Sequence, residues 1–191
     1  NKNSTTLIKD LKTDENQDWR KKHLSIIYNN YRSSKFFKDY YSFIEDVFES
    51  TKNKSFLLDI TTIITTSILN FLNIKKELTF SSQLEINEKY KKDQRNYKIV
   101  NKLKGNIYFS GITAKEYQKS DEVPNDLLLI YQDFWNYFDL EVKSKNSNLV
   151  NGSSIIDLLF VLGKSQIIDI YDKYVPYNLK KQELIFNKKN F

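Results

Sequence analysis

The sequence predicts a helix-rich α/β fold with a mainly parallel sheet flanked by helices. Short apolar segments with strand character alternate along the chain with longer segments in which apolar residues recur every three or four positions. This alternation is typical of βαβ units, in which a helix connects two parallel strands. The chain has 191 residues, which is enough for one domain with a substantial core. We expect residues 1–175 to form a single α/β domain and residues 176–191 to form a basic C-terminal tail.

The N-terminal third is predicted to be mostly helical. Residues 7–12 form a short apolar segment with weak strand character. In residues 17–30 the apolar and aromatic side chains fall on one face of a helix. The stripe consists of Trp19, His23, Ile26 and Ile27, and it continues to Tyr31 just beyond this range. Helices are also predicted at 35–50, where the many aromatic residues indicate core packing, and at 56–72, which is too long for a strand without a turn.

The middle of the chain alternates between predicted strands and helices. Residues 76–84 are predicted to form a strand that ends at Ser81 and Ser82. A charged loop at 85–92 separates this strand from a helix at 95–104. Gly105 follows the helix, and glycine is common just beyond helix C-termini because it tolerates the left-handed conformation found there.

The next predicted strand, residues 107–109, is followed by a turn at Ser110-Gly111 and a short helix through Tyr117. Pro124 and Asn125 indicate a turn before a strongly apolar strand at 127–132. Residues 133–152 show no clear pattern. Further along, the sequence predicts a loop at 144–148, a helix at 153–162 that ends at Gly163, and a helix at 166–174 that ends before Pro176.

The turn at Ser110-Gly111 is the first candidate binding site. Ligands of parallel α/β sheets bind beyond the carboxyl ends of the strands, so Ser82 and Ser110 are expected at one edge. Backbone N–H groups of the following helix, with Lys115, would bind a phosphate or carboxylate. The alternative is structural: Ser110 caps the helix, Gly111 is required by the turn, and the hydroxyls of Ser81 and Ser82 satisfy their own loop.

Composition excludes several classes of site. There is no Cys and only one His, and no carboxylate cluster has metal-ligand spacing, so we expect no metal. We also expect no other cofactor, because the chain lacks a phosphate-binding loop and a dinucleotide fingerprint. The net charge of +6 is spread along the chain, which argues against nucleic acid. No apolar stretch is long enough to span a membrane.

His23 is the candidate general base, because imidazole titrates in the range that proton transfer from an amine requires. Its alternative role is packing at the edge of the core. Ser154 and Asp157 have the spacing of a helix capping box, although Asp157 would also be placed to orient His23 or a substrate amine. Tyr108 and Tyr117 are candidate substrate-binding residues among the thirteen tyrosines of the chain.

The order of these motifs resembles the WbqC-like protein family, whose members are encoded in bacterial gene clusters for O-antigen and other surface polysaccharides. The resemblance covers roughly residues 7–163. It rests on five blocks: Trp19, Lys22-His23, Ile27 and Tyr31; Leu58-Asp59; Ser81-Ser82; Tyr108-Phe109-Ser110-Gly111 with Tyr117; and Ser154-Ile155-Ile156-Asp157-Leu158-Leu159-Phe160 with Gly163. The family's opening Gln-Pro…Pro-Trp…Gly-Tyr segment is absent, so the chain resembles the later part of the family. Family members usually have a tyrosine-and-glutamine segment before the Ser-Ile-Ile-Asp block. Tyr137 is the counterpart of its tyrosine in this chain, but no Gln follows it.

The resemblance implies a cytoplasmic transferase of surface-polysaccharide (lipopolysaccharide) biosynthesis that attaches an acyl or aminoacyl group, glycyl by the usual suggestion, to an amino sugar. A sugar nucleotide or another small molecule would be the substrate. One alternative is a glycosyltransferase that uses the same sugar nucleotide. The other is a non-catalytic scaffold or binding module of a glycan assembly complex. The sequence leaves the oligomeric state open.

Overall fold

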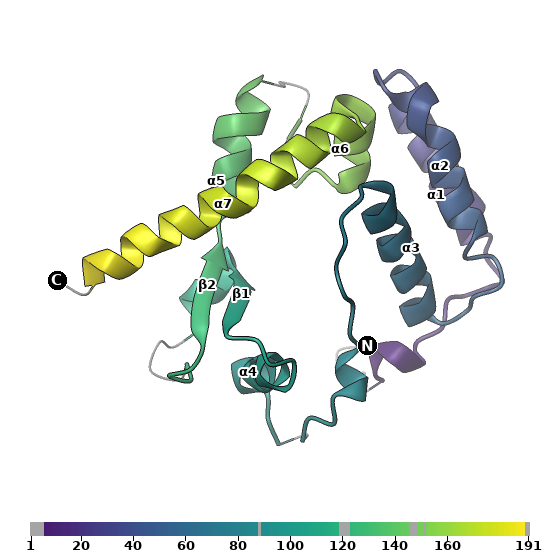
Figure 1. Ribbon diagram of the computed structural model, residues 1–191. Helices are drawn as coiled ribbons and strands as arrows, with labels where there is room; N and C mark the ends of the chain where they lie inside the picture. The colour runs from purple at the N-terminus through teal and green to yellow at the C-terminus, as the bar shows by residue number, and fades with distance from the viewer. Residues whose placement is uncertain (1–5, 88, 119–122, 146–148, 151, 190–191) are drawn as a thin grey trace. The chain divides into compact units, whose positions relative to one another are not determined.

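The computed structural model describes residues 6–87, 89–118, 123–145, 149–150 and 152–189. It confirms a helix-rich α/β fold with a small parallel sheet (Figure 1). The chain divides into two compact units, which are described separately. The first comprises Asn1–Lys76 and Ser147–Ile170, and the second comprises Glu77–Asn146 and Tyr171–Phe191.

The first unit consists of helices. In chain order they are the 3₁₀ turn η1 (Ile8–Asp10), α1 (Trp19–Tyr31), α2 (Phe37–Glu49), α3 (Leu57–Phe71), α6 (Ile155–Leu162) and the beginning of α7 (Lys164–Lys189). Three of the long helices, α1 to α3, lie within three residues of the ranges predicted from periodicity. The positions of these three helices were therefore predicted correctly from their apolar stripes.

The core of the first unit forms around Phe160, which is fully buried. Its ring lies 5.2 Å from that of Tyr31 and 5.3 Å from that of Phe37, measured between centroids. Its carbonyl accepts a 3.0 Å hydrogen bond from the backbone N–H of Phe36. The α6 helix ends at Gly163, whose φ of +78° favours glycine, as the sequence predicted.

The second unit contains the sheet. Its elements are the 3₁₀ turn η2 (Ser81–Gln83), α4 (Lys92–Lys102), β1 (Ile107–Gly111), the 3₁₀ helix η3 (Ile112–Glu116), β2 (Leu128–Gln132), α5 (Phe134–Tyr137), the π-helical turn η5 (Phe138–Val142), η6 (Lys143–Lys145) and the rest of α7. The ring of Tyr174, in α7, packs against Phe134 and Tyr137 at 5.2 and 5.3 Å between centroids.

The two strands are parallel and pair from Ile107 with Leu128 to Gly111 with Gln132. Because side chains alternate along a strand, the face that includes Tyr108 and Ser110 also includes Leu129 and Tyr131. The α4 helix packs on this face, where the ring of Tyr97 meets that of Tyr108 edge-on at 5.9 Å. On the opposite face Ile107, Phe109 and Leu128 are 43%, 42% and 44% exposed.

Two predicted strands are wrong. In residues 7–12 the backbone forms η1, and Lys12 makes one isolated antiparallel bridge with Phe56. In residues 76–84 the regular element is η2, and Leu78 is exposed. Both segments have apolar residues, but neither finds a neighbouring strand, and a strand without a partner leaves its backbone groups unpaired.

Several helix boundaries also differ from prediction. The α4 helix begins at Lys92, inside the predicted loop, and Lys104 rather than Gly105 takes the left-handed conformation after it, with φ +55°. Residues 134–145, which lacked a clear pattern, are helical, including the first two residues of the predicted loop at 144–148; residues 146–148 lie outside the described ranges. The α7 helix continues through Pro176, so residues 176–189 are helical.

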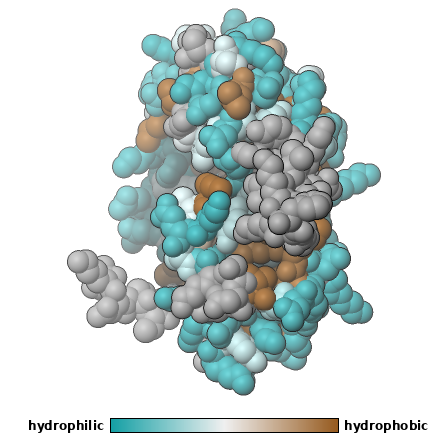
Figure 2. All heavy atoms as spheres, turned by 90° about the vertical axis from the view of Figure 1, so that its left-hand side faces the viewer, coloured by the Kyte–Doolittle hydropathy of each residue, from teal (hydrophilic) through white to brown (hydrophobic). Residues whose placement is uncertain are grey.

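Among the residues that are coloured in Figure 2, hydrophilic ones predominate, as expected for a chain of which 28% is charged. Within the described ranges, every helix is too short or too polar to cross a membrane.

Candidate functional site

The carboxyl ends of β1 and β2 lie side by side because the strands are parallel and in register. Ser110 is paired with Tyr131, and Gly111 with Gln132. Ser110 is only 4% exposed, and Asp133, directly after β2, is also buried. The position predicted for a site therefore carries polar groups from both strands.

A cluster of polar side chains occupies the α4-facing side of this edge. We call it the tyrosine cluster, and its members are Asp93, Asn96, Tyr108, Tyr117, Gln118 and Tyr131. The amide of Asn96 donates a 3.0 Å hydrogen bond to the hydroxyl of Tyr108. The amide of Gln118 donates a 2.7 Å hydrogen bond to the carboxylate of Asp93. These bonds connect α4 to β1 and to the segment that follows η3.

The ionisation of Tyr131 is influenced by three other members of the cluster. Burial raises the pKa of Tyr131, and the neighbouring Asp93, Tyr108 and Tyr117 raise it further because each disfavours the phenolate. Tyr131 is therefore a neutral hydroxyl at physiological pH, able both to donate and to accept hydrogen bonds. Together with the Asp93 carboxylate and two amides, such hydroxyls suit a ligand rich in hydroxyl groups.

The turn after Ser110 differs from the predicted anion site. The strand continues through Gly111, and the next element is the 3₁₀ helix η3, five residues long. Gly111 has φ −66°, and a Cβ placed on it would meet no atom within 4 Å. Gly111 is therefore not required by a left-handed turn, and Ser110 is a strand residue rather than a helix cap. Lys115 and Tyr117 are exposed beside this edge.

Ser81 and Ser82 are exposed residues of η2 and do not end a strand. Their predicted position at the sheet edge beside Ser110 is therefore wrong, because residues 76–84 form no strand. Their role in substrate binding stays a prediction.

His23 lies in α1, in the first unit, and its side chain is exposed. Its Nδ1 is 2.6 Å from the carbonyl oxygen of Trp19, and its ring stacks on Phe48 at 6.2 Å between centroids. A carbonyl oxygen can only accept, so Nδ1 carries the proton in the neutral ring and Nε2 keeps a lone pair. This is the tautomer in which Nε2 can accept a proton from a substrate.

Asp157 and Ser154 form the predicted capping box at the start of α6. The Ser154 backbone donates to Asp157 Oδ2 at 2.6 Å, and the Ser154 hydroxyl accepts from the backbone N–H of Ile156 at 3.2 Å. The other carboxylate oxygen, Oδ1, accepts a 2.5 Å hydrogen bond from the hydroxyl of Tyr31. Asp157 is thus bonded to Tyr31 and Ser154, and His23 to Trp19; within the described residues no hydrogen bond or ion pair joins Asp157 to His23.

Four residues of the tyrosine cluster were not among the residues predicted from the sequence. Tyr131 could have been found, because it follows from placing the strand at 127–132 parallel to β1 and pairing it with Ser110. Asp93, Asn96 and Gln118 carry no comparable signal, since α4 was predicted to begin after Asp93 and nothing in the sequence placed this helix on the sheet. Within the described residues, no group of three or more His, Cys, Asp or Glu side chains could hold a metal ion.

Comparison with known proteins identifies the family of this chain. The model of the WbqC-like protein family matches residues 1–169. No curated protein and no solved structure matches the chain. The family match covers most of the sequence and includes every candidate site residue, and the chain therefore belongs to the WbqC-like protein family.

Proposed function

We propose that this WbqC-like protein acts in the biosynthesis of bacterial surface polysaccharides, such as O-antigen, and transfers an acyl or aminoacyl group to the amine of an amino sugar. Membership of the family is consistent with a role in polysaccharide biosynthesis. The observation that carries the proposal is the tyrosine cluster, which gathers hydroxyl, amide and carboxylate groups beside the carboxyl ends of two parallel strands. Such groups recognise the many hydroxyls of a sugar.

In the proposed reaction, the sugar nitrogen attacks the carbonyl carbon of an activated acyl donor, a thioester or an ester. The new C–N amide bond forms, the bond from carbon to sulfur or oxygen breaks, and the amine loses a proton. His23 is proposed to accept that proton through Nε2 and return it to the departing thiol or alcohol. Asp157 acts as a positioning residue through its bond to Tyr31, which lies on the same helix as His23.

The remaining predicted residues are proposed to bind substrate. Ser110, Gly111 and Lys115 are assigned to an anionic group of the sugar carrier, and Tyr108 and Tyr117 to sugar hydroxyls. Ser81 and Ser82 are exposed and are assigned to outer parts of the substrate. Ser154 already accepts a hydrogen bond in the capping box, so its contribution to binding is through its remaining hydroxyl proton.

A thermal-shift screen against UDP- and dTDP-linked amino sugars, with the bare nucleotides alongside, tests substrate binding. A ligand at a hundredfold over its dissociation constant stabilises the folded state by about 2.7 kcal/mol, which raises Tm by about 5 to 10 °C for a chain of this size. Tyr131→Phe should reduce the shift, because it removes one hydroxyl from the tyrosine cluster. No shift with any amino sugar would contradict the binding half of the proposal.

The scaffold alternative has one observation in its favour: the exposed apolar side chains of Ile107, Phe109 and Leu128 on the sheet face opposite α4. If this face binds another protein of a glycan assembly complex, replacing Phe109 with Ser should abolish complex formation and leave the thermal shift with amino sugars unchanged.

A further inference from the structure

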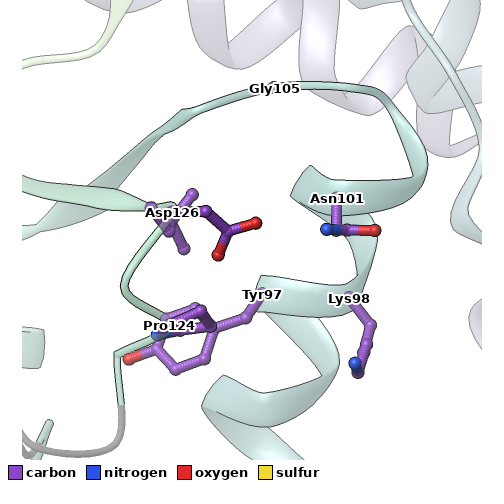
Figure 3. Close-up of a pocket in the computed structure, with 7 residues that line it drawn as sticks. Tyr97, Lys98, Asn101, Gly105, Pro124 and Asp126 are labelled. Carbon is purple, nitrogen blue, oxygen red and sulfur yellow. The ribbon is translucent and has the colours of Figure 1, made fainter.

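A hollow of about 210 Å³ lies where the chain leads into the two strands. It is bordered by the C-terminal half of α4 and by the segments that lead into β1 and β2 (Figure 3), and its polar lining residues Lys98, Asn101 and Asp126 are exposed to solvent. The lining residues used below are Tyr97, Lys98, Asn101, Gly105, Asp126 and Leu127. All of them belong to the second unit, so the hollow is complete within it.

Two polar side chains face this hollow from opposite walls. The carboxylate of Asp126 projects from the segment before β2 toward α4, and the amide of Asn101 extends from α4 on the other side (Figure 3). Within the described residues, neither side chain forms a hydrogen bond or an ion pair. Both groups are therefore available to a ligand, and the carboxylate is a strong acceptor for a charged donor.

The cation on the lining is directed elsewhere. Lys98 Nζ lies 5.3 Å from the ring centroid of Tyr90, over its face, and Figure 3 shows the Lys98 side chain extending away from Asp126. A cation over an aromatic ring is attracted by the ring's quadrupole. The charge that faces the hollow is therefore that of Asp126, while the buried ring of Tyr97 and the side chain of Leu127 provide an apolar wall.

We propose that this hollow binds a small aliphatic amine with a hydroxyl or carbonyl oxygen close to its nitrogen. The ammonium group donates to Asp126, the oxygen accepts from the amide of Asn101, and the carbon skeleton packs on Tyr97. The volume limits the ligand: it equals that of about seven water molecules at ~30 Å³ each, and it is smaller than the roughly 300 to 1,000 Å³ of most sites for drug-sized ligands. One sugar-sized molecule fits this volume, and a sugar nucleotide does not.

The site goes beyond the proposed function, because it requires neither turnover nor the tyrosine cluster. Its backbone wall includes Gly105, whose N–H donates a 2.9 Å hydrogen bond to the carbonyl of Val100. A Cβ at Gly105 would lie 3.0 Å from a methyl carbon of Val100, so glycine keeps this wall close to α4. The Gly105 amide is therefore a local reporter of binding.

An NMR titration of the ¹⁵N-labelled full chain with D-glucosamine tests the proposal, with D-glucose as the neutral analogue in which a hydroxyl replaces the amine. We expect glucosamine, and not glucose, to shift the backbone amide of Gly105 and the side-chain amide of Asn101. Asp126→Asn keeps the shape of the side chain and removes its charge, and it should weaken glucosamine binding by about tenfold or more. Asp172→Asn is the matched control, because Asp172 is an exposed carboxylate of the same unit.

Equal shifts with glucose would overturn the assignment of Asp126 as an ammonium partner. Shifts that persist unchanged in Asp126→Asn would overturn that assignment as well, and the absence of any shift at Gly105 and Asn101 would overturn the site itself. The dispersion of the remaining amide signals establishes that each variant is folded. Because the readout is local binding, a failure of acyl transfer would leave this result unaffected, and the reverse also holds.

Discussion

The hydroxyl of Tyr31 donates a 2.5 Å hydrogen bond to Oδ1 of Asp157 and so joins the last turn of α1 to the first turn of α6. The two residues are 126 positions apart in the chain. The same carboxylate also caps α6 through Ser154, so one side chain fixes both the start of a helix and its attachment to another. Tyr31 also packs on Phe160, which connects this polar contact to the core.

Removing the Tyr31 hydroxyl should destabilise the protein. Tyr31→Phe keeps the ring against Phe160 but leaves a partly buried carboxylate with one fewer donor, at a cost of about 1 to 3 kcal/mol. Urea unfolding followed by circular dichroism measures the difference. Tyr28→Phe is the control, since Tyr28 is on the same helix and is exposed, and it should change stability by less than about 0.5 kcal/mol. Equal effects of the two changes would contradict the role given to the Tyr31–Asp157 bond.

Acid should remove the contribution of Asp157. Burial acts to raise the pKa of this carboxyl, but the hydrogen bonds from Tyr31 and Ser154 outweigh it and lower the pKa below the ordinary 3.8. The stabilisation is therefore complete above the unfolded-state pKa and is lost as pH falls through the lower folded value. Unfolding free energies measured between pH 2 and 7 should fall less steeply at the acid end for Asp157→Asn than for the wild type.

Alkaline pH should remove the contribution of Tyr31 to stability. Burial, and then the hydrogen bond to Asp157 and its charge, raise the pKa of Tyr31 from 10.0 to about 12. Because the folded pKa is raised, the stabilisation is complete below about pH 10 and is lost as pH rises from 10 toward 12. Unfolding followed across this range should show a loss of stability in the wild type that is smaller in Tyr31→Phe. Identical profiles would contradict the contact.

Arg20, a partly buried residue of α1, should be sensitive to substitution. Its guanidinium donates to the Thr51 carbonyl at 2.9 Å and the Lys54 carbonyl at 2.7 Å, and it pairs with Glu15 at 2.9 Å. Lysine cannot reproduce this planar arrangement of donors. We expect Arg20→Lys to cost about 1 to 3 kcal/mol in a denaturant titration, whereas Arg32→Lys, at an exposed position beyond α1, should be nearly neutral.

Two glycines with left-handed backbone form a matched pair. Gly163 has φ +78°, and a Cβ there would lie 3.2 Å from the ring of Phe36; Gly152 has φ +90°, with no atom within 4 Å of such a Cβ. Alanine at either position should lower the free energy of unfolding by about 1 to 2 kcal/mol, because a residue with a Cβ is strained in the left-handed conformation. Gly163→Ala should cost more than Gly152→Ala, because only the former also displaces an aromatic ring. Thermal unfolding of the two variants gives the comparison.

Helices with a clear apolar stripe could be predicted from the sequence, and elements whose form depends on distant partners could not. The helices α1, α2 and α3 were placed correctly because their periodicity is local, and the apolar run at 127–132 correctly gave β2. The segment 76–84 also contains apolar residues, but it has no neighbouring strand and forms η2 instead. Pro176 is a usual helix-ending signal because it lacks an N–H, yet α7 continues through it.

The same distinction applies to the candidate site. The strand that carries Tyr108 and Ser110 was predicted from its local pattern and is confirmed as β1, while the binding roles of Tyr108, Ser110 and Tyr117 stay predictions. Asp93 lies near Tyr131 only through the packing of α4 on the sheet, which no local pattern predicts. The capping box of Ser154 and Asp157 is confirmed, while the bond from Tyr31 to Asp157 depends on a contact between distant helices.

The most direct test of the account is turnover measured by mass spectrometry, with UDP- and dTDP-linked amino sugars and with acyl or glycyl thioesters and esters as donors. We expect a product heavier than the intact sugar nucleotide by one acyl or aminoacyl group, no release of free nucleotide, and loss of product in His23→Ala with unchanged unfolding behaviour. Release of free nucleotide would favour a glycosyltransferase instead. Full activity of His23→Ala, or no acylated product with any donor, would contradict the proposed transfer.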